Sequence, residues 1–204
     1  MAKPIGVMGG TFDPIHFGHL VTAEAACEAY DLEEVIFVPA GRPPHKAAKY
    51  ISDSQHRYFM TVLATIDNPR FTVSRVELDR PGYSYTVDTL RTLYAEYPER
   101  EIFFITGADA VLEICSWRDP WSVLELCHFI AATRPGYHLQ SLDRLRATLG
   151  EEHSQRVHPL TVPALAISSS DIRERVQAGR SIRYLLPTSV ENYIHKKGLY
   201  RHGG

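Results

Sequence analysis

The chain carries the stretch Gly9-Gly10-Thr11-Phe12-Asp13-Pro14-Ile15-His16-Phe17-Gly18-His19 between a short apolar run over residues 5–8 and a helical pattern over residues 20–30. This order predicts a strand, a tight turn and a helix. Glycines let the backbone approach an anion closely, and the first turn of a helix presents unpaired N–H groups to it. His16 and His19 are three residues apart and therefore share one face of that turn. The stretch predicts a binding site for a polyphosphate.

Other interpretations of this stretch have less support. A pair of histidines at this spacing also occurs at helix caps and on protein surfaces. Zinc needs three or four ligands, and no cysteine or carboxylate cluster accompanies His16 and His19 at ligand spacing, so we expect no protein-bound metal. The stretch matches neither the GxGxxG pattern of dinucleotide-binding proteins nor the GxxxxGK[ST] pattern of P-loops. Ordinary dehydrogenases and nucleoside triphosphatases therefore lose their best sequence support.

Composition points to a compact protein without a strong overall charge. The chain has 204 residues and a net charge of −2, and we expect one domain over residues 1–204. This charge gives no basic field for nucleic acid or an acidic membrane surface, so we expect neither as a partner. Cys27, Cys115 and Cys127 lack CxxC spacing, and buried free thiols are expected. No leader pattern and no apolar run of about 18 residues occurs, so we expect a cytoplasmic protein.

Apolar runs rich in β-branched and aromatic residues alternate with amphipathic stretches along the chain. Strands are predicted over residues 5–8, 35–38, 71–76, 102–106, 129–132 and 157–162. Helices are predicted over residues 20–30, 54–66, 86–97, 121–126, 142–149, 170–178 and 189–196. The alternation indicates an α/β fold, a doubly wound parallel sheet with helices on both faces. Ligands bind at the carboxyl ends of the strands in such sheets.

Several polar residues lie at the predicted helix starts and strand ends. Residues 168–170 are serines before a helix, where they suit an N-cap and, with Arg173, an anion site. Asp109 follows a strand and a glycine, where it either caps a helix or accepts hydrogen bonds from a sugar. Ser84 is a plausible cap for the helix over residues 86–97.

Two other segments are open to a purely structural interpretation. The loop over residues 41–49 combines prolines with several cations, as a solvated surface loop also would. Trp117 would equally suit an ordinary core position, because most tryptophans are largely buried.

The motifs resemble those of the nucleotidyltransferase superfamily. Residues 10–19 look like its (S/T)FDPxHxGH signature, and Ile167-Ser168-Ser169-Ser170-Asp171-Ile172-Arg173 looks like its second signature, ISSTxIR, with Ser170 where threonine is common. The segments between them resemble the bacterial nicotinate mononucleotide adenylyltransferases, and the likeness extends to Lys197-Gly198-Leu199-Tyr200. These intervening segments are Pro43-Pro44-His45-Lys46, Tyr83-Ser84-Tyr85-Thr86-Val87-Asp88-Thr89, Gly107-Ala108-Asp109 and Arg134-Pro135-Gly136.

The resemblance implies a Rossmann-like sheet and an enzyme of NAD biosynthesis. ATP and nicotinate mononucleotide would give nicotinate adenine dinucleotide and pyrophosphate, with Mg²⁺ bridging ATP phosphates and no dedicated protein ligand for it. Catalytic roles would belong to His16, His19, Lys46 and Arg173. ATP would contact Gly9, Gly10, Thr11, Phe12, His16, His19, Gly107, Asp109, Ile167, Ser168, Ser169 and Arg173. Nicotinate mononucleotide would contact Lys46, Thr86, Trp117, Arg118 and Arg134. Whether the protein forms a homo-oligomer stays open.

In similar enzymes the backbone N–H groups at the positions of Thr86 and Arg118 meet the nicotinate carboxylate, and an aromatic ring at the position of Trp117 stacks on the pyridine. Such donors favour a carboxylate over a carboxamide, because a carboxylate only accepts and carries charge. Many relatives have an aromatic residue where Arg118 stands. A nicotinamide mononucleotide adenylyltransferase is the nearest alternative, and a regulatory nucleotide-binding module is an alternative of another class. Phosphopantetheine adenylyltransferases are less similar, since they are shorter and usually have threonine at the position of His16.

Overall fold

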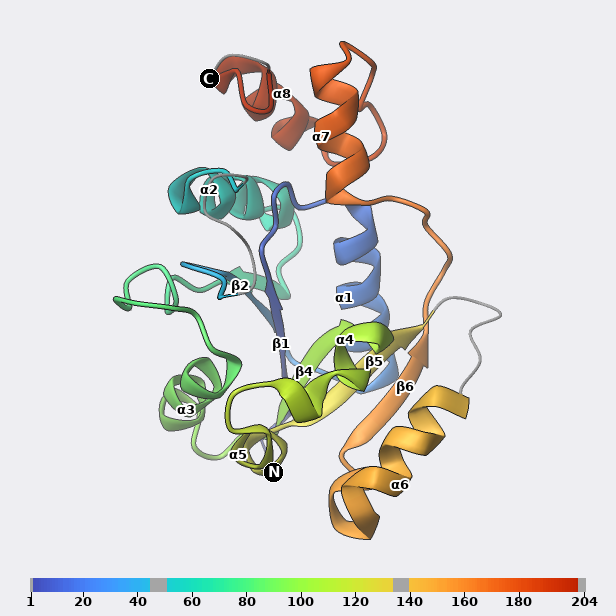
Figure 1. The fold of residues 1–204 in the computed structure, drawn as a ribbon. Coiled ribbons are helices and arrows are strands. Elements are labelled where there is room, and N and C mark those ends of the chain that lie inside the picture. Colours follow the sequence, from blue (N-terminus) through green and yellow to red (C-terminus); the bar gives the residue numbers. More distant parts are fainter. Residues whose placement is uncertain (1, 45–50, 134–139, 202–204) are drawn as a thin grey trace.

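The computed structural model describes residues 2–44, 51–133 and 140–201, and it contains one six-stranded sheet with helices on both faces (Figure 1). Every pair of neighbouring strands is parallel. The strands are β1 (Ile5–Gly10), β2 (Val35–Pro39), β3 (Phe71–Val73), β4 (Ile102–Gly107), β5 (His128–Thr133) and β6 (Val157–Thr161). The predicted doubly wound α/β sheet is confirmed.

The strand order β3-β2-β1-β4-β5-β6 places β1 at the centre, where the order reverses. The chain builds one half of the sheet outward from β1, then returns to β4 and builds the other half. Val7 pairs with Ile36 of β2 on one side and with Phe104 of β4 on the other. In this topology ligands bind in the crevice beyond the carboxyl ends of the two central strands. The turn after β1 therefore lies at the position where a ligand site is expected.

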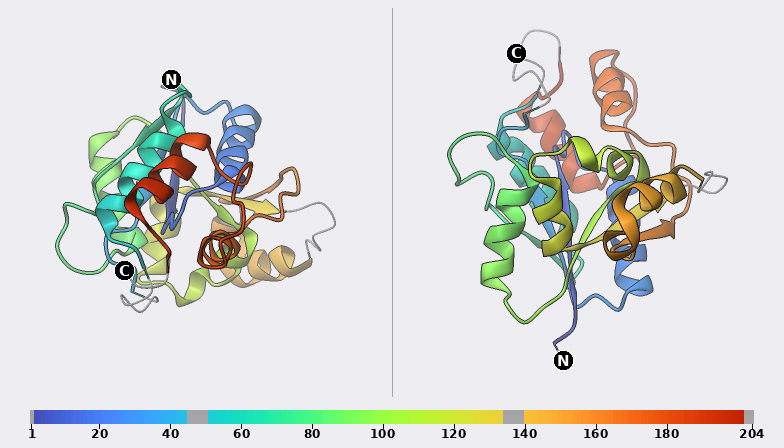
Figure 2. Two further views of the ribbon diagram at one scale, coloured as in Figure 1. Left: turned by 90° about the horizontal axis from the view of Figure 1, so that it is seen from above. Right: turned by 60° about the horizontal axis from the view of Figure 1, so that its bottom comes forward.

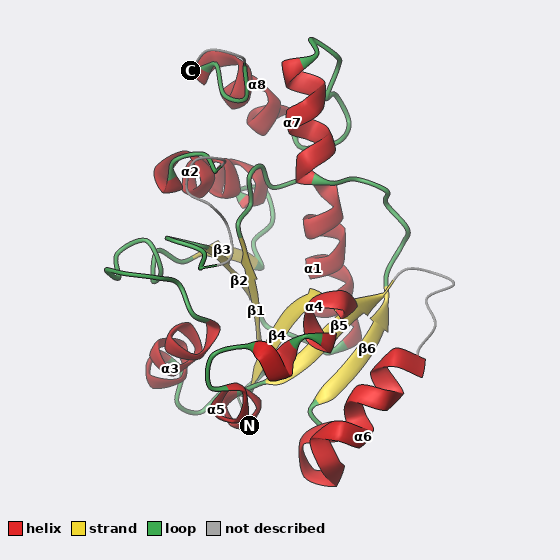
Figure 3. Ribbon diagram, viewed as in Figure 1, coloured by secondary structure: helices red, strands yellow, loops and turns green. Residues whose placement is uncertain are grey.

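The helices form two layers over the sheet (Figure 3). Buried residues of α3, α4, α5 and α6 join one apolar cluster, and those of α1, α2, α7 and α8 join the other. Figure 2 shows α8 and the C-terminal segment beside α2. The helices are α1 (Phe17–Ala29), α2 (Ser54–Thr65), α3 (Thr86–Glu96), α4 (Ala108–Leu112), α5 (Pro120–Leu126), α6 (Gln140–Ser154), α7 (Ser169–Gln177) and α8 (Thr188–Lys197), with a 3₁₀ turn η2 (Ile114–Ser116).

Some predicted boundaries were wrong. The strand predicted over 71–76 ends at Val73, because the N–H of Val76 turns back to the Ser74 hydroxyl over 3.2 Å. The short helix α4 is not among the helices predicted from periodicity, and only the capping alternative for Asp109 implied it. The helix predicted over 142–149 extends over Gln140–Ser154, with a kink at Gly150 (φ 78°). Cys115 is exposed, in contrast to the expected buried thiol, whereas Cys27 and Cys127 are buried. Among the described residues, no helix is long and apolar enough to cross a membrane.

Gly41 sits in a tight junction just after β2. Its N–H donates to the Ser84 hydroxyl over 3.0 Å, and its carbonyl accepts from Nη2 of Arg57 over 3.2 Å. A Cβ atom at Gly41 would overlap the carbonyl group of Glu77. The absence of a side chain is therefore a packing requirement.

We expect Gly41→Ala to lower the free energy of unfolding by about 1–3 kcal/mol, because backbone must move to admit the methyl group. Urea denaturation monitored by circular dichroism measures this change. Gly107→Ala is the matched control, since a Cβ atom at Gly107 meets no atom within 4 Å. Equal losses in the two variants would contradict the prediction.

Candidate active site

The two histidines of the first motif face one another at the start of α1. His16 is the N-cap, and its ring centroid lies 3.8 Å from that of His19 with 30° between the ring planes. The backbone N–H of His16 donates to Nδ1 of His19 over 3.2 Å. Because Nδ1 accepts this bond, the neutral His19 ring carries its proton on Nε2. The prediction that His16 and His19 share one face of the first turn of the helix is confirmed. The Nε2–H group of His19 is a hydrogen-bond donor on that face.

Burial keeps both rings neutral near pH 7. It lowers the pKa of His16 from 6.5 to about 4, and burial together with the nearby His16 ring lowers the pKa of His19 to about 3. Nδ1 of His16 is buried, and no described residue hydrogen-bonds to it. A buried polar atom of this kind needs a partner such as a ligand or water. An anion beside the pair would favour protonation and raise both pKa values.

Phe12 packs against the histidine pair from the core of the protein. It adopts a positive φ of 48° and is only 2% exposed, so its ring points into the core. The ring packs edge-on against His19 at a centroid distance of 5.1 Å. A Cβ atom at Gly10 would lie 2.7 Å from the Phe12 ring, so the glycine makes room for it. Thr11 contributes its carbonyl oxygen, which accepts from Nη1 of Arg57 over 2.8 Å.

A pocket of about 290 Å³ opens beside the histidine pair. Five residues predicted to contact ATP line it, namely Gly9, His16, His19, Gly107 and Ile167. The sequence analysis missed the other lining residues, Met8, Gly18, Thr22, Ile105, Thr106, Ala132, Thr133, Val162, Pro163 and Leu165. Many of these lie at the carboxyl ends of β4, β5 and β6. The rule that ligands bind at that edge of the sheet is the signal that could have found them.

The serine-rich signature begins α7 next to the turn after β1. Ser168 is the N-cap, as predicted, and its hydroxyl accepts from the N–H of Asp171 over 3.1 Å. Ser169 donates to the carbonyl of Pro14 over 2.8 Å, and Nη1 of Arg173 donates to the carbonyl of Asp13 over 2.7 Å. The structure therefore joins the two signatures, which are far apart in the sequence. Ser168, Ser169 and Arg173 do not line the pocket beside the histidines.

Asp109 lies in the first turn of α4 and is exposed. The N-cap of this helix is Gly107, so the alternative that Asp109 caps it is wrong. Asp109 is not among the described residues that line the pocket beside the histidines, and its predicted contact with a sugar stays a prediction.

A second pocket, of about 470 Å³, lies between the start of α3 and the segment after η2. Thr86, Trp117 and Arg118 line it, together with Pro44, Ser84, Tyr85 and Ser116. Trp117 also packs edge-on against Phe104 and Phe129 of the sheet. Thr86 is the first residue of α3, whose leading N–H groups have no partner inside the helix. The three predicted residues that the structure describes are thus brought together.

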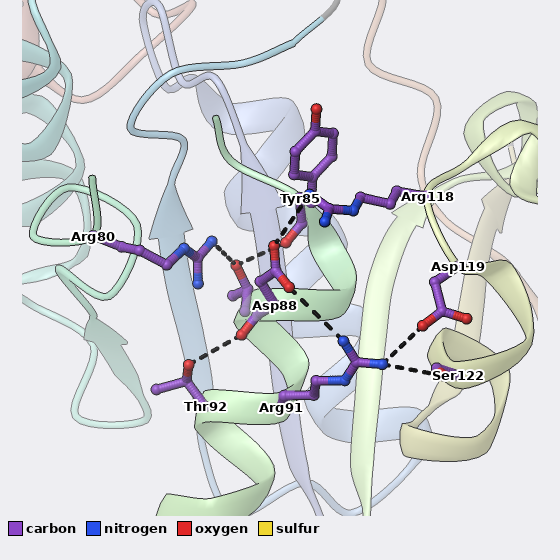
Figure 4. Close-up of polar contacts among 9 residues, drawn as sticks. Arg80, Tyr85, Asp88, Arg91, Thr92, Arg118, Asp119 and Ser122 are labelled. Carbon is purple, nitrogen blue, oxygen red and sulfur yellow. Dashed lines mark hydrogen bonds and ion pairs between the residues drawn. The ribbon is translucent and has the colours of Figure 1, made fainter. Parts of the chain in front are cut away.

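The Arg118 side chain is held at the rim of this second pocket (Figure 4). Its guanidinium lies 4.5 Å from the ring centroid of Tyr85, and its Nη1 lies 3.9 Å from Oδ2 of Asp88. Such a cation–π contact suits the planar guanidinium. Arg91 pairs with the neighbouring Asp119 over 2.7 Å. Tyr85, the N-cap of α3, and Asp88 in its first turn therefore hold a positive group in the pocket that Thr86 also lines.

Ser84 does not cap α3, contrary to the prediction. The N-cap is Tyr85, and the Ser84 hydroxyl instead accepts from the N–H groups of Gly41 and Arg42 over 3.0 and 3.1 Å. The Ser84 hydroxyl therefore bonds to backbone more than 40 residues away in the sequence and not to the backbone of its own helix.

Lys46 and Arg134 lie outside the described residues. Within residues 2–44, 51–133 and 140–201, no group of three or more His, Cys, Asp or Glu side chains could hold a metal ion.

Comparisons with known proteins show the family of the chain. The cytidylyltransferase-like family model matches residues 7–175. A protein of Moorella thermoacetica named "Probable nicotinate-nucleotide adenylyltransferase" is 58% identical over 198 residues, which cover 97% of this chain and 91% of that protein. The chain belongs to the nicotinate-nucleotide adenylyltransferases. A similarly named protein of Thermoanaerobacter sp. is 54% identical over 97% of this chain and 94% of its own length.

A solved structure confirms the fold of this nicotinate-nucleotide adenylyltransferase family member. The Plasmodium falciparum nicotinic acid mononucleotide adenylyltransferase complexed with NaAD matches with a TM-score of 0.76 and 20% identity, covering 98% of both chains. The same enzyme complexed with APC matches with a TM-score of 0.74.

The lowered histidine pKa values predict how the stability of this adenylyltransferase depends on pH. The unfolded chain binds protons at histidine near pH 6.5, whereas folded His16 and His19 bind them only near pH 4 and 3. Protons therefore favour the unfolded state, and the free energy of unfolding falls as the pH drops from about 6.5 toward 4. Urea titrations at several pH values measure this slope.

A double variant, His16→Gln with His19→Gln, is the control and is expected to show a shallower slope. The pKa values of His128 and His158 are also lowered by burial and account for part of the remainder. An unchanged slope in the double variant would contradict the assignment.

Proposed function

We propose that this chain transfers the adenylyl group of ATP to nicotinate mononucleotide, giving nicotinate adenine dinucleotide and pyrophosphate. The observation that carries the proposal is the pair of pockets built around the segment after β4. Gly107 lines the pocket beside the histidine pair, and Trp117, ten positions later in the same segment, lines the pocket at the start of α3. Two substrates could thus meet at one edge of the sheet.

The chemistry needs positioning and charge stabilisation more than a strong base. An oxygen of the mononucleotide 5′-phosphate attacks the α-phosphorus of ATP, the bond from that phosphorus to the bridging oxygen breaks, and the bridging oxygen leaves with pyrophosphate. The attacking oxygen is already anionic, so no side chain must remove a proton from it. No covalent intermediate with the protein is required.

Neutral imidazoles and a guanidinium suit the charges of this reaction. We assign His16 and His19 to the α- and β-phosphates, where His19 would donate from Nε2. Arg173 has five N–H donors; the structure engages one with Asp13 and one with Ser170, so others could meet the leaving pyrophosphate with Ser169. Lys46 is assigned to the moving phosphoryl charge. Mg²⁺ would enter with ATP, shielding its phosphates.

The nicotinate end would be recognised by backbone amides. No described residue accepts a hydrogen bond from the N–H groups of Thr86 or Arg118. Both residues line the same pocket, where Trp117 could stack on a pyridine ring. The guanidinium of Arg118 adds positive charge at the rim. We place the reaction in the cytoplasm, where free Cys27, Cys115 and Cys127 would stay reduced.

We expect pyrophosphate release from Mg²⁺-ATP to be much more efficient with nicotinate mononucleotide than with nicotinamide mononucleotide or phosphopantetheine. A coupled pyrophosphate assay gives kcat/KM for each acceptor. His19→Ala controls for contaminating activity and should lose about 10²–10³-fold in kcat, as when one donor to developing charge is removed. Preference for another acceptor would overturn the proposed substrate, and no release with any of them would overturn the proposed reaction.

Thr86→Pro tests the backbone donor alone. Proline is tolerated at the first position of a helix, and the preceding Tyr85 is already extended, with φ −111° and ψ 136°. We expect kcat/KM for the acid mononucleotide to fall about tenfold or more, because a hydrogen bond to a charged group is lost. The amide substrate should lose less. Thr86→Val keeps the N–H and should retain the preference for the acid, whereas equal losses on both substrates in the proline variant would remove this role.

A further inference from the structure

No role in the reaction described above is assigned to the motif Lys197-Gly198-Leu199-Tyr200. Its last residue nevertheless contacts Asp13 of the first signature. Gly198 closes α8 with a φ of 64°, and the N–H of Leu199 donates back to the carbonyl of Ile194 over 3.0 Å. Tyr200 follows with a φ of 65° and turns its ring inward. Its hydroxyl donates to Oδ1 of Asp13 over 2.7 Å, across 187 positions of sequence.

Asp13 is only 4% exposed, and both oxygens of its carboxylate have defined donors. Oδ1 accepts from the Tyr200 hydroxyl, and Oδ2 accepts from the N–H of Ser52 over 3.1 Å. A buried carboxylate must be hydrogen-bonded, and water has little access to replace a missing donor here. The orientation of Asp13 therefore depends on Tyr200.

The backbone of the same turn holds the start of α7. The carbonyl of Asp13 accepts from Nη1 of Arg173, and the carbonyl of the next residue, Pro14, accepts from the Ser169 hydroxyl. His16 begins α1 two residues further on. The turn therefore sets the separation between the histidine pair and the side chains assigned to pyrophosphate.

We propose that Tyr200 is a positioning residue for adenylyl transfer, which orients Asp13 and through the Asp13–Pro14 turn places Arg173 and Ser169 opposite the histidine pair. This role rests on the proposed function. In this role the effect of Tyr200 on the reaction passes through the turn. Residues 198–201, which follow α8, thereby become part of the site's support.

Tyr200→Phe removes the hydroxyl and keeps the ring. We expect kcat of the forward reaction to fall about tenfold, because small displacements of charge-stabilising groups are costly. In the reverse reaction, KM for pyrophosphate should rise about tenfold while KM for the dinucleotide changes less than about twofold. This split is expected because the side chains that bond to the turn directly, Ser169 and Arg173, are those assigned to pyrophosphate.

Tyr184→Phe is the matched control. Tyr184 also has a φ of 65°, but it is 83% exposed, and its loss of a hydroxyl should leave all three constants unchanged. Thermal unfolding gives the melting temperature of each variant. The rates are then measured below the lower of these temperatures, so that they refer to folded protein.

Asp13→Asn provides a second variant should Tyr200→Phe fail to fold. Its amide has one acceptor oxygen for two donors, so it should produce the same rise in KM for pyrophosphate. A lower melting temperature with unchanged kcat and unchanged KM for pyrophosphate would overturn the role, because Tyr200 would then only anchor the C-terminal segment. No turnover by the unmodified protein would instead overturn the proposed function, and this role with it.

Discussion

A buried guanidinium holds together the loops on which this structure depends. Arg57 in α2 is only 1% exposed, and it donates from Nε to Ser52, from Nη1 to Thr11 and from Nη2 to Gly41, each time to a backbone carbonyl. Burial lowers the pKa of Arg57, and the nearby Asp13 carboxylate opposes that effect. A buried charge left without partners is strongly destabilising. The turn after β1 and the segments around Gly41 and Ser52 must therefore stay close to one another.

The turn after β1 is consequently held by hydrogen bonds from several separate segments of the chain. Arg57 holds the Thr11 carbonyl, Tyr200 and Ser52 hold the Asp13 carboxylate, and residues of α7 hold its backbone. The histidine pair is carried on this braced turn. Neutral, partly desolvated imidazoles can receive an anionic phosphate without first breaking an ion pair, since burial keeps their pKa values low. The charged groups assigned to the reaction come from other segments.

Local sequence patterns predicted the helices and strands well, but they predicted the hydrogen-bond partners of individual side chains poorly. The start of α7 at Ser168 follows from a serine that caps its own helix, which depends on neighbouring residues alone. Ser84 has the same local chemistry, but its hydroxyl accepts from Gly41 and Arg42 across the loop, and it caps nothing. The strand predicted over 71–76 ended early for a related reason, because the Ser74 hydroxyl accepts a hydrogen bond from the backbone N–H of Val76. Periodicity carries no information about such competing bonds.

By itself the sequence determined the parallel α/β sheet, the turn after β1 with His16 and His19 on one face, and the family to which the chain belongs, because these rest on short-range spacing and on motifs within single segments. Only the tertiary structure decided that Ser169 and Arg173 bind the Asp13–Pro14 turn, that Arg118 rests on Tyr85, and that Tyr200 reaches Asp13. The physical reason is that buried polar groups must find partners wherever the packed chain brings one within hydrogen-bonding distance, irrespective of separation in sequence.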